Sequence, residues 1–321
     1  MTIDPAIAAL MALAPAPDPA AALQPVSVRR DAIEADFAAM MGSLQGRTFD
    51  DVDVVETTVP GPTRDIPVRI FRPTGETAEL PALLYFFGGG FWMRAYNSPD
   101  ILTACRQVAS QARAVVVEID YALAPEHPFP AAIDEGLAVL AWMATGAGEH
   151  LIDPARLAVG GQSAGGGLSA SIAIRARDEG GPAIALQVLE VPGIDLSFSQ
   201  FVPPPAPYTA EDLAGLVESI EFYLPEGMDS ADPAVSPISV ADLSGLPPAL
   251  VINAEYDPLR PSGERFAARL REAGVPVVST TYGGQVHNSP GLPGISAASR
   301  AWREQVSWAV STMHGDGGVF W

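Results

Sequence analysis

Cysteine and basic residues are scarce in this chain of 321 residues. The single cysteine, Cys105, excludes an internal disulfide, and its setting in an expected helix indicates a buried, unreactive thiol. Lysine and arginine together number 18 against 38 aspartates and glutamates, which gives a formal net charge of -20. Because so acidic a surface repels phosphate backbones and anionic lipids, we expect no nucleic-acid partner and no membrane partner.

Long hydrophobic runs are also missing. No uninterrupted apolar run approaches the length of about 20 residues that spans a bilayer. Residues 1–22 are rich in alanine, but they lack a basic beginning and are interrupted by prolines and aspartates, so we expect no signal peptide. These absences predict a soluble, cytoplasmic protein.

The length of 321 residues indicates one large domain, alone or with a small appendage. Hydrophobic residues make up 48% of the chain and charged residues 17%, which is sufficient for a packed core. Apolar strands alternate with helical patterns, an order that predicts a mostly parallel sheet with helices on both faces, the α/β class. The strands are expected at 52–59, 66–71, 81–87, 114–119, 156–159, 185–190, 249–254 and 277–282. The main helices are expected at 5–13, 28–42, 101–111, 131–144, 168–176, 211–224 and 297–313.

The second of these helices carries an apolar stripe. Ile33, Phe37, Met40 and Met41 recur in it at helical spacing. Such a stripe is expected of a helix packed against the body and equally of a helix in a lid, so both interpretations stay open.

One segment interrupts the alternation of strands and helices. Residues 197–224 contain the proline-rich run 203–207 and then a helical pattern, and they are too long for a simple crossover between two strands. Long insertions in α/β enzymes are usually lids or binding loops.

The candidate nucleophile is Ser163. It lies in Gly-Gln-Ser-Ala-Gly at 161–165, between the expected strand 156–159 and the expected helix 168–176. A Gly-x-Ser-x-Gly pattern between a strand and a helix is typical of a nucleophile elbow, in which a strained turn presents the serine hydroxyl above the sheet. An ordinary glycine-rich turn gives the same pattern, so the interpretation depends on partners elsewhere in the chain.

Two partners follow from the positions of the remaining strands. A serine hydroxyl needs a base, usually a histidine held by a carboxylate, and such groups lie beyond the carboxyl ends of the strands. Of the four histidines, His287 alone follows an expected strand, and Asp257 follows the strand before it. Asp257 alone could cap a helix, and His287 alone could be a loop histidine. Together with Ser163 they have the chain order of an elbow-type hydrolase and predict a catalytic triad.

Three backbone amides are expected to stabilise the oxyanion. The glycines 88–90 directly follow an expected strand, where the missing side chains allow the backbone to approach a substrate. With the residue after the nucleophile, they predict an oxyanion hole formed by the N–H groups of Gly89, Gly90 and Ala164.

Taken together, these features resemble the hormone-sensitive-lipase-like family of α/β-hydrolase carboxylesterases. The resemblance is carried by residues 66–73, 88–91, 121–132, 161–166 and 255–260. It implies an eight-stranded, mostly parallel sheet in a catalytic domain, 49–321, with a helical cap formed by 1–48 and an insertion at about 197–226. It also implies hydrolysis of esters with short acyl chains, without metal or cofactor, and often a homodimer.

The sequence departs from the family pattern at several positions. Phe87 stands where the family has a histidine that positions the oxyanion loop, and Gln162 stands where it has an aspartate. Residues 261–263 and 288–290 also differ from the usual ones. No member of the predicted triad is lost, so the departures suggest an unusual substrate or a modified loop geometry.

The sequence therefore predicts a serine carboxylesterase. Five aromatic residues are candidates for an apolar substrate pocket, although core packing explains each of them equally well: Phe91, Trp92, Tyr208, Phe222 and Tyr223. An amidase, a carbamate hydrolase or a lactonase with the same triad is an alternative. A non-catalytic small-molecule receptor is a third, less favoured interpretation, because such receptors typically lose a triad residue.

Overall fold

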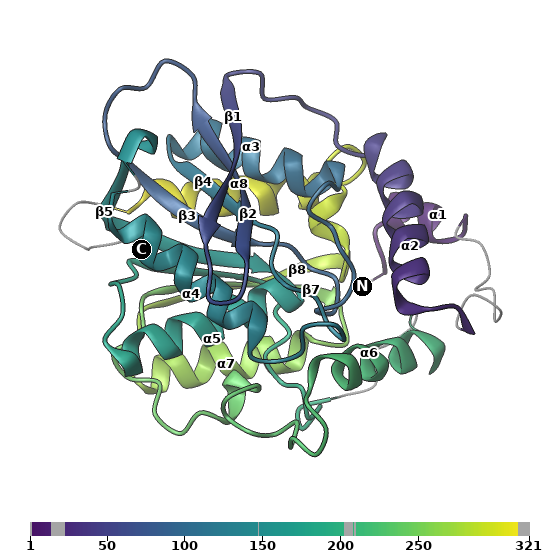
Figure 1. Ribbon diagram of the computed structural model, residues 1–321. Coiled ribbons are helices and arrows are strands. Elements are labelled where there is room, and N and C mark those ends of the chain that lie inside the picture. The colour runs from purple at the N-terminus through teal and green to yellow at the C-terminus, as the bar shows by residue number, and fades with distance from the viewer. Residues whose placement is uncertain (1, 14–22, 147, 202–207, 209, 314–321) are drawn as a thin grey trace.

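An eight-stranded sheet forms the centre of the computed structural model, which describes residues 2–13, 23–146, 148–201, 208 and 210–313 (Figure 1). The spatial order of the strands is β1-β2-β4-β3-β5-β6-β7-β8. Strand β2 pairs antiparallel with β1 and β4, and all pairs from β4 to β8 are parallel. The strands are β1 (Val52–Pro60), β2 (Asp65–Pro73), β3 (Leu80–Phe86), β4 (Val115–Ile119), β5 (Ile152–Gln162), β6 (Leu186–Glu190), β7 (Ala249–Tyr256) and β8 (Val277–Val286). The predicted α/β class and the eight-stranded, mostly parallel sheet are confirmed.

The helices form a layer on each face of the sheet (Figure 1). Helices α3 and α8 pack together on one face, and α4, α5 and α7 lie on the other. The helices are α1 (Pro5–Met11), α2 (Val26–Gly42), α3 (Pro99–Ala112), α4 (Ala131–Ala144), α5 (Ala164–Glu179), α6 (Ala210–Tyr223), α7 (Arg260–Glu272) and α8 (Ala297–Ser311), with short 3-10 turns η2 (Gly148–His150), η3 (Pro237–Ser239) and η4 (Ser289–Gly291).

Burial follows from this layering. Every residue of β3, β4 and β6 is buried, because helices cover both faces of the central strands. These strands are mostly apolar, with Glu118 in β4 and Gln187 and Glu190 in β6 as buried polar residues. The edge strand β1 leaves most of its residues partly or fully exposed. In α3, Cys105 is buried as expected, and burial raises the pKa of its thiol well above the ordinary value.

Strands β5 and β8 differ most in length from the strands that the sequence pattern predicts. β5 begins at Ile152 instead of Arg156, and β8 continues past Tyr282 to Val286. In β8 the register shifts after Ala254 of β7, so that Tyr256 pairs with Val286. A bulge of this kind lets a strand continue through glycines that, read along the sequence, indicate its end.

Helices α1, α2 and α6, which we call the peripheral helices, lie together on the right in Figure 1. The predicted stripe of α2 packs only in part: Met41 is buried, whereas Ile33 and Met40 are 37% and 40% exposed. Met41 joins a small apolar cluster with Ile7, Leu44, Tyr256, Val286 and Leu292, which fixes α1 and α2 to the ends of β7 and β8. The proline-rich run 203–207 lies outside the described residues.

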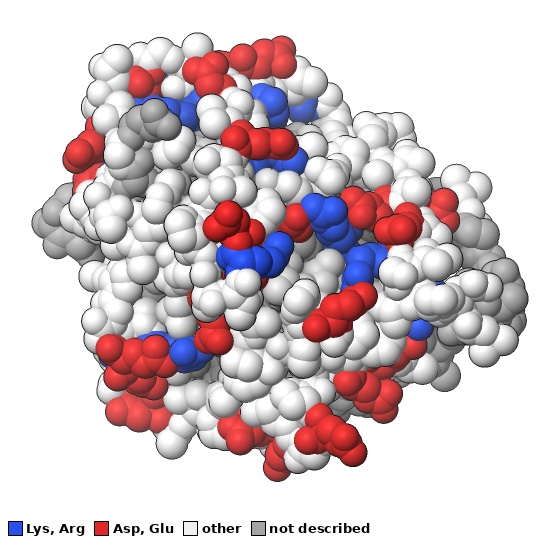
Figure 2. Space-filling view, viewed as in Figure 1, with Lys and Arg blue, Asp and Glu red and all other residues white. Residues whose placement is uncertain are grey.

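The surface charge is carried by acidic residues and arginines, since all 18 basic residues are arginines. On the face shown in Figure 2 the basic side chains form small groups beside acidic ones. In the described part of the chain, every helix is too short or too polar to cross a bilayer.

Candidate active site

Ser163 occupies the sharp turn between β5 and α5. Its φ of 54° and ψ of -118° are strained for a residue with a side chain. The flanking glycines are sterically required, because a Cβ on Gly161 or Gly165 would lie 2.2 or 2.1 Å from the Phe86 carbonyl oxygen. The chain therefore has the backbone geometry expected of a nucleophile elbow.

His287 and Asp257 lie beside this serine. His287 directly follows β8, and Asp257 directly follows β7. The Nε2 atom of His287 is 2.8 Å from Ser163 Oγ, and its Nδ1 atom is 2.8 Å from Asp257 Oδ2. The structure thus brings together the three side chains that the sequence proposed as partners.

The Asp257 carboxylate makes two local interactions at once. Its Oδ1 atom accepts the Leu259 amide at 2.8 Å, while Oδ2 faces the imidazole of His287. The side chain is fully buried. The structural and functional interpretations of this aspartate are therefore compatible, because the same carboxylate shapes the start of the α7 segment and holds the imidazole.

Two opposing effects act on the imidazole. Burial lowers the pKa of His287, whereas the charge of Asp257 and its hydrogen bond raise it. The net effect raises the pKa of His287 above its ordinary value. The imidazole is consequently a stronger base than a histidine in water.

The three glycines after β3 lie against the elbow. A Cβ on Gly88 would be 3.3 Å from Ser163 Cβ. Gly89 and Gly90 have φ angles of +130° and +58°, which favour glycine. Within the described part of the chain, the amides of Gly89, Gly90 and Ala164 donate to no protein acceptor.

Tyr121 supports the glycine loop at Phe87. The Tyr121 hydroxyl donates to the Phe87 carbonyl at 3.0 Å. The two rings stack with centroids 4.3 Å apart, and both side chains are fully buried. Aromatic stacking and one buried hydrogen bond therefore hold the residue that replaces the family's histidine.

Glu190 contacts the elbow and was not among the site residues predicted from the sequence. Its backbone carbonyl accepts the Ser163 amide at 2.9 Å, and its carboxylate accepts Trp302 Nε1 at 2.7 Å. Burial raises the pKa of Glu190 to about 7, although the nearby Arg303 and the hydrogen bond from Trp302 partly oppose the shift. An acidic residue at the end of an apolar strand was the only signal for this position.

The aromatic candidates fall into two groups. Phe91 stacks on Tyr223 with centroids 4.0 Å apart, and Trp92 meets Phe222 edge-on at 5.5 Å. These contacts pack the peripheral helix α6 onto the chain that follows the glycines. Tyr208 lies elsewhere: its hydroxyl accepts the backbone N–H of His287 at 2.9 Å.

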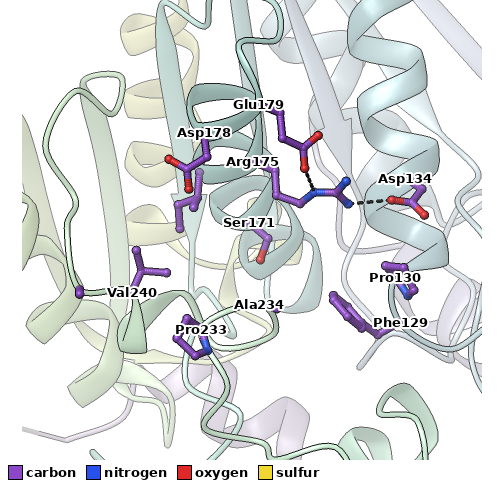
Figure 3. A pocket seen from close by; sticks show the side chains of 12 residues that line it. Phe129, Pro130, Asp134, Ser171, Arg175, Asp178, Glu179, Pro233, Ala234 and Val240 are labelled. Atoms are coloured by element: carbon purple, nitrogen blue, oxygen red, sulfur yellow. Dashed lines mark hydrogen bonds and ion pairs between the residues drawn. The ribbon is translucent and has the colours of Figure 1, made fainter.

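A cavity of about 600 Å³ lies apart from these residues, between α4, α5 and residues 233–241 (Figure 3). Arg175 lines it and pairs with Asp134 and Glu179. None of the predicted site residues lines this cavity. Among the described residues, no group of three His, Cys, Asp or Glu side chains is placed to hold a metal ion.

Comparison with known protein families identifies the relatives of this chain. Residues 83–290 match the family model of the α/β-hydrolase fold. Carboxylesterase NlhH of Mycobacterium tuberculosis is 41% identical over 230 residues, which cover 70% of each chain. An ethyl acetate hydrolase of Pseudomonas putida is 32% identical over 300 residues, covering 90% of this chain and 92% of that protein.

Solved structures of esterases superimpose on nearly the whole chain. A hyperthermophilic esterase from Pyrobaculum calidifontis superimposes with a TM-score of 0.85 at 33% identity, covering 98% of this chain and 99% of that one. A bacterial heroin esterase gives a TM-score of 0.84 at 33% identity, with 97% of both chains covered. The chain therefore belongs to the hormone-sensitive-lipase-like carboxylesterases of the α/β-hydrolase fold.

Proposed function

We propose that this protein is a serine carboxylesterase that hydrolyses small esters with short acyl chains. One observation carries the proposal: the His287 imidazole lies within hydrogen-bond distance of both Ser163 Oγ and the buried carboxylate of Asp257. A serine hydroxyl, an imidazole and a carboxylate in this order are the groups that nucleophilic acyl transfer requires.

Acylation begins when Ser163 Oγ attacks the ester carbonyl carbon. His287 Nε2 takes the hydroxyl proton, and Asp257 stabilises the imidazolium that forms. The amides of Gly89, Gly90 and Ala164 donate to the carbonyl oxygen as it becomes negative. The tetrahedral intermediate then collapses, His287 returns the proton to the leaving alcohol, and the acyl group stays on Ser163.

Deacylation repeats these steps with water as the nucleophile. His287 takes a proton from water, whose oxygen attacks the acyl carbon under the same three amides. Collapse of this second intermediate releases the carboxylic acid and returns the proton to Ser163. Water is the only co-reactant in these steps.

The preference for small esters rests on two observations. The relative from Pseudomonas putida is an ethyl acetate hydrolase. In addition, Phe91, Trp92 and Tyr223 are buried and pack against their neighbours, which favours a small acyl group beside the glycine loop. We further propose that the peripheral helices α1, α2 and α6 form the cap of the site.

Several loop residues differ from the family pattern, so cleavage of a bond other than a simple ester is a second candidate function. Phe87, Gln162 and the segments 261–263 and 288–290 differ from the family pattern, and the same triad can cleave amides, carbamates or lactones. Matched ester, amide, carbamate and lactone probes with the same acyl group separate the alternatives. We expect the ester to have the highest kcat/KM, and an ester rate well below the others would overturn the proposed bond specificity.

Ser163→Ala tests the mechanism itself. We expect it to lose at least about 10³-fold in kcat on a short-chain aryl ester, because the nucleophile is gone. The matched control is Ser169→Ala in α5, the helix that follows Ser163, since Ser169 is fully buried and its hydroxyl donates to the Gly165 carbonyl at 2.8 Å. Undiminished turnover by Ser163→Ala would overturn the proposal.

A further inference from the structure

The peripheral helix α6 contacts the glycine loop through Ser219. The Ser219 hydroxyl accepts Trp92 Nε1 at 3.1 Å and donates to the Gly215 carbonyl at 2.8 Å. It also lies directly over Gly90, where a Cβ would be 2.6 Å from Ser219 Oγ. The serine is buried, so this contact is shielded from bulk water.

The backbone of Trp92 is hydrogen-bonded to the glycine loop. Its backbone amide and that of Met93 both donate to the Gly89 carbonyl, at 3.2 and 2.8 Å. The turn from Gly89 to Met93 is therefore closed, and a displaced Trp92 displaces the two glycines before it. Ser219 holds the indole end of the same residue.

The segment before α6 contacts the other half of the site. Tyr208 accepts the backbone N–H of His287 at 2.9 Å, across 79 residues of sequence. A local hydrogen bond also stabilises the chain around His287, since Ser289 Oγ accepts the Val286 amide at 2.8 Å. Tyr208 thus holds the backbone of His287, whose imidazole must stay within hydrogen-bond distance of Ser163 and Asp257.

Helix α6 is itself anchored to the body and to α2. Arg29 of α2 makes two hydrogen bonds to Glu218, at 2.8 and 2.6 Å, and its guanidinium lies 5.0 Å from the Trp92 ring. At the end of the helix, the Tyr223 carbonyl accepts the Phe129 amide at 2.8 Å. Ser219 is therefore presented to the glycine loop by a helix held on both sides.

We propose that Ser219 and Tyr208 are positioning residues, the first for the oxyanion loop and the second for His287. The inference rests on the proposed function, because it assigns to the cap a role in aligning the groups that carry out acyl transfer. In this proposal, Tyr208 and Ser219 keep the imidazole of His287 and the amides of the glycine loop correctly placed relative to each other. Ser219 acts through the Trp92 indole, and Tyr208 acts through the backbone N–H of His287.

Ser219→Ala tests the first role. The variant leaves the Trp92 indole N–H without its acceptor, and we expect kcat on a short-chain aryl ester to fall about tenfold, with KM changed less than about twofold. The matched control is Ser307→Ala in α8, which removes another buried hydroxyl bonded to the carbonyl four residues earlier, Arg303, at 3.1 Å. The control should keep both constants.

Tyr208→Phe tests the second role with a readout that stability alone does not change. We expect kcat to fall about fivefold and the acid limb of kcat/KM to move to lower pH. An imidazole held less firmly against Asp257 loses part of the interaction that raises its pKa. The control is Tyr282→Phe, which removes a 3.0 Å hydroxyl bond to Gln305 from the strand leading to His287.

Each outcome decides the proposal. An increase in KM at unchanged kcat would mean that the residue contacts the substrate, and wild-type kinetics would mean that it positions nothing; either result overturns its role. If Ser163→Ala is inactive while both variants match wild type, the positioning roles fail and the proposed function stands. If Ser163→Ala remains active, the proposed function fails and the positioning roles fail with it.

Discussion

The strand ends and the peripheral helices are held in place by different interactions. Ser163 lies between a fully buried strand end and α5, a helix buried along most of its length, with glycines in backbone contact around it. The peripheral helices make a small apolar cluster and aromatic contacts with the body, and arginine ion pairs add to these: Arg29 with Glu218 joins α2 to α6, and Arg30 with Glu126 joins α2 to the loop before α4. Close packing tolerates little displacement, whereas partly exposed ion pairs stabilise weakly.

The apolar surface shows the same contrast. Val28 and Val217 of the peripheral helices are 49% and 46% exposed, and Ile33 and Met40 of α2 are also more than a third exposed. The strand ends that carry Asp257 and His287 are buried. We infer that the strand ends fix the chemistry, whereas the peripheral helices can change by substitution without disturbing the sheet. Ser219 and Tyr208 connect the two regions.

Asp257→Asn changes the strand-end machinery alone and should have the largest effect. An amide facing His287 Nδ1 favours the wrong tautomer of the imidazole, so we expect kcat to fall by about 10³- to 10⁴-fold at nearly unchanged KM. Steady-state kinetics with a short-chain aryl ester measure this change. A loss of less than tenfold would show that the carboxylate does not orient the base.

Gly90→Ala acts where the two regions meet. Its φ of +58° and the 2.6 Å approach to Ser219 Oγ leave no room for a methyl group, so we expect the loop to shift and kcat to fall about 10²-fold. Gly75→Ala is the matched control, because Gly75 also has a positive φ, +77°, but has open space around it. The control should cost about 1 kcal/mol of stability and no activity. Equal kinetic losses in both variants would contradict a specific role for the loop.

Glu190→Gln tests the packing beneath the elbow through stability. The unfolded chain releases the Glu190 proton near pH 4.5, whereas the folded protein keeps it until about pH 7. Folding stability contributed by this group is therefore lost as the pH rises through that window. Glutamine stays neutral and still accepts from Trp302, so the variant should be more stable than wild type above pH 7, by on the order of 1–3 kcal/mol.

Urea unfolding at pH 5 and pH 8 measures this difference. The control is Glu272→Gln, which removes the same charge from an exposed position of α7. If the free energy of unfolding changes by the same amount between the two pH values in wild type and in Glu190→Gln, Glu190 does not take up a proton on folding.

Glu218→Gln weakens the peripheral helices alone and should have the smallest effect. The Glu218 side chain is 36% exposed, so we expect a loss of less than about 1 kcal/mol in stability and an increase in KM of about twofold at constant kcat. High salt screens the ion pair and should reduce the difference in stability between wild type and the variant. Glu272→Gln, which breaks the exposed pair with Arg265, is again the control. A large fall in kcat would contradict this ranking and show that the ion pair is needed to hold Ser219 against the glycine loop.

Much of the fold follows from local patterns in the sequence. The bounds of α4 were predicted as the structure has them, because an apolar helical pattern begins after Pro130 and ends at Thr145. Ser163, Asp257 and His287 could be predicted to lie close together because each follows a strand, and the carboxyl ends of parallel strands meet at one edge of the sheet.

The remaining features depend on contacts between distant segments. The order of the strands places β4 between β2 and β3, which no local pattern encodes. The hydrogen bond from Tyr121 to Phe87 and that from His287 to Tyr208 join residues 34 and 79 positions apart. Tyr208 was predicted for its aromatic ring, whereas the contact that the structure shows uses its hydroxyl. Such roles depend on tertiary geometry, which composition and periodicity do not contain.

Covalent labelling of Ser163 tests the central claim most directly. The protein is incubated with a fluorophosphonate, and the adduct is counted by intact mass and mapped by peptide analysis. We predict one adduct per chain on Ser163, its absence in Ser163→Ala, and strongly slowed labelling in His287→Ala, because the hydroxyl then lacks its base. Labelling that persists at another residue in Ser163→Ala, or that proceeds at the wild-type rate in His287→Ala, would contradict the account.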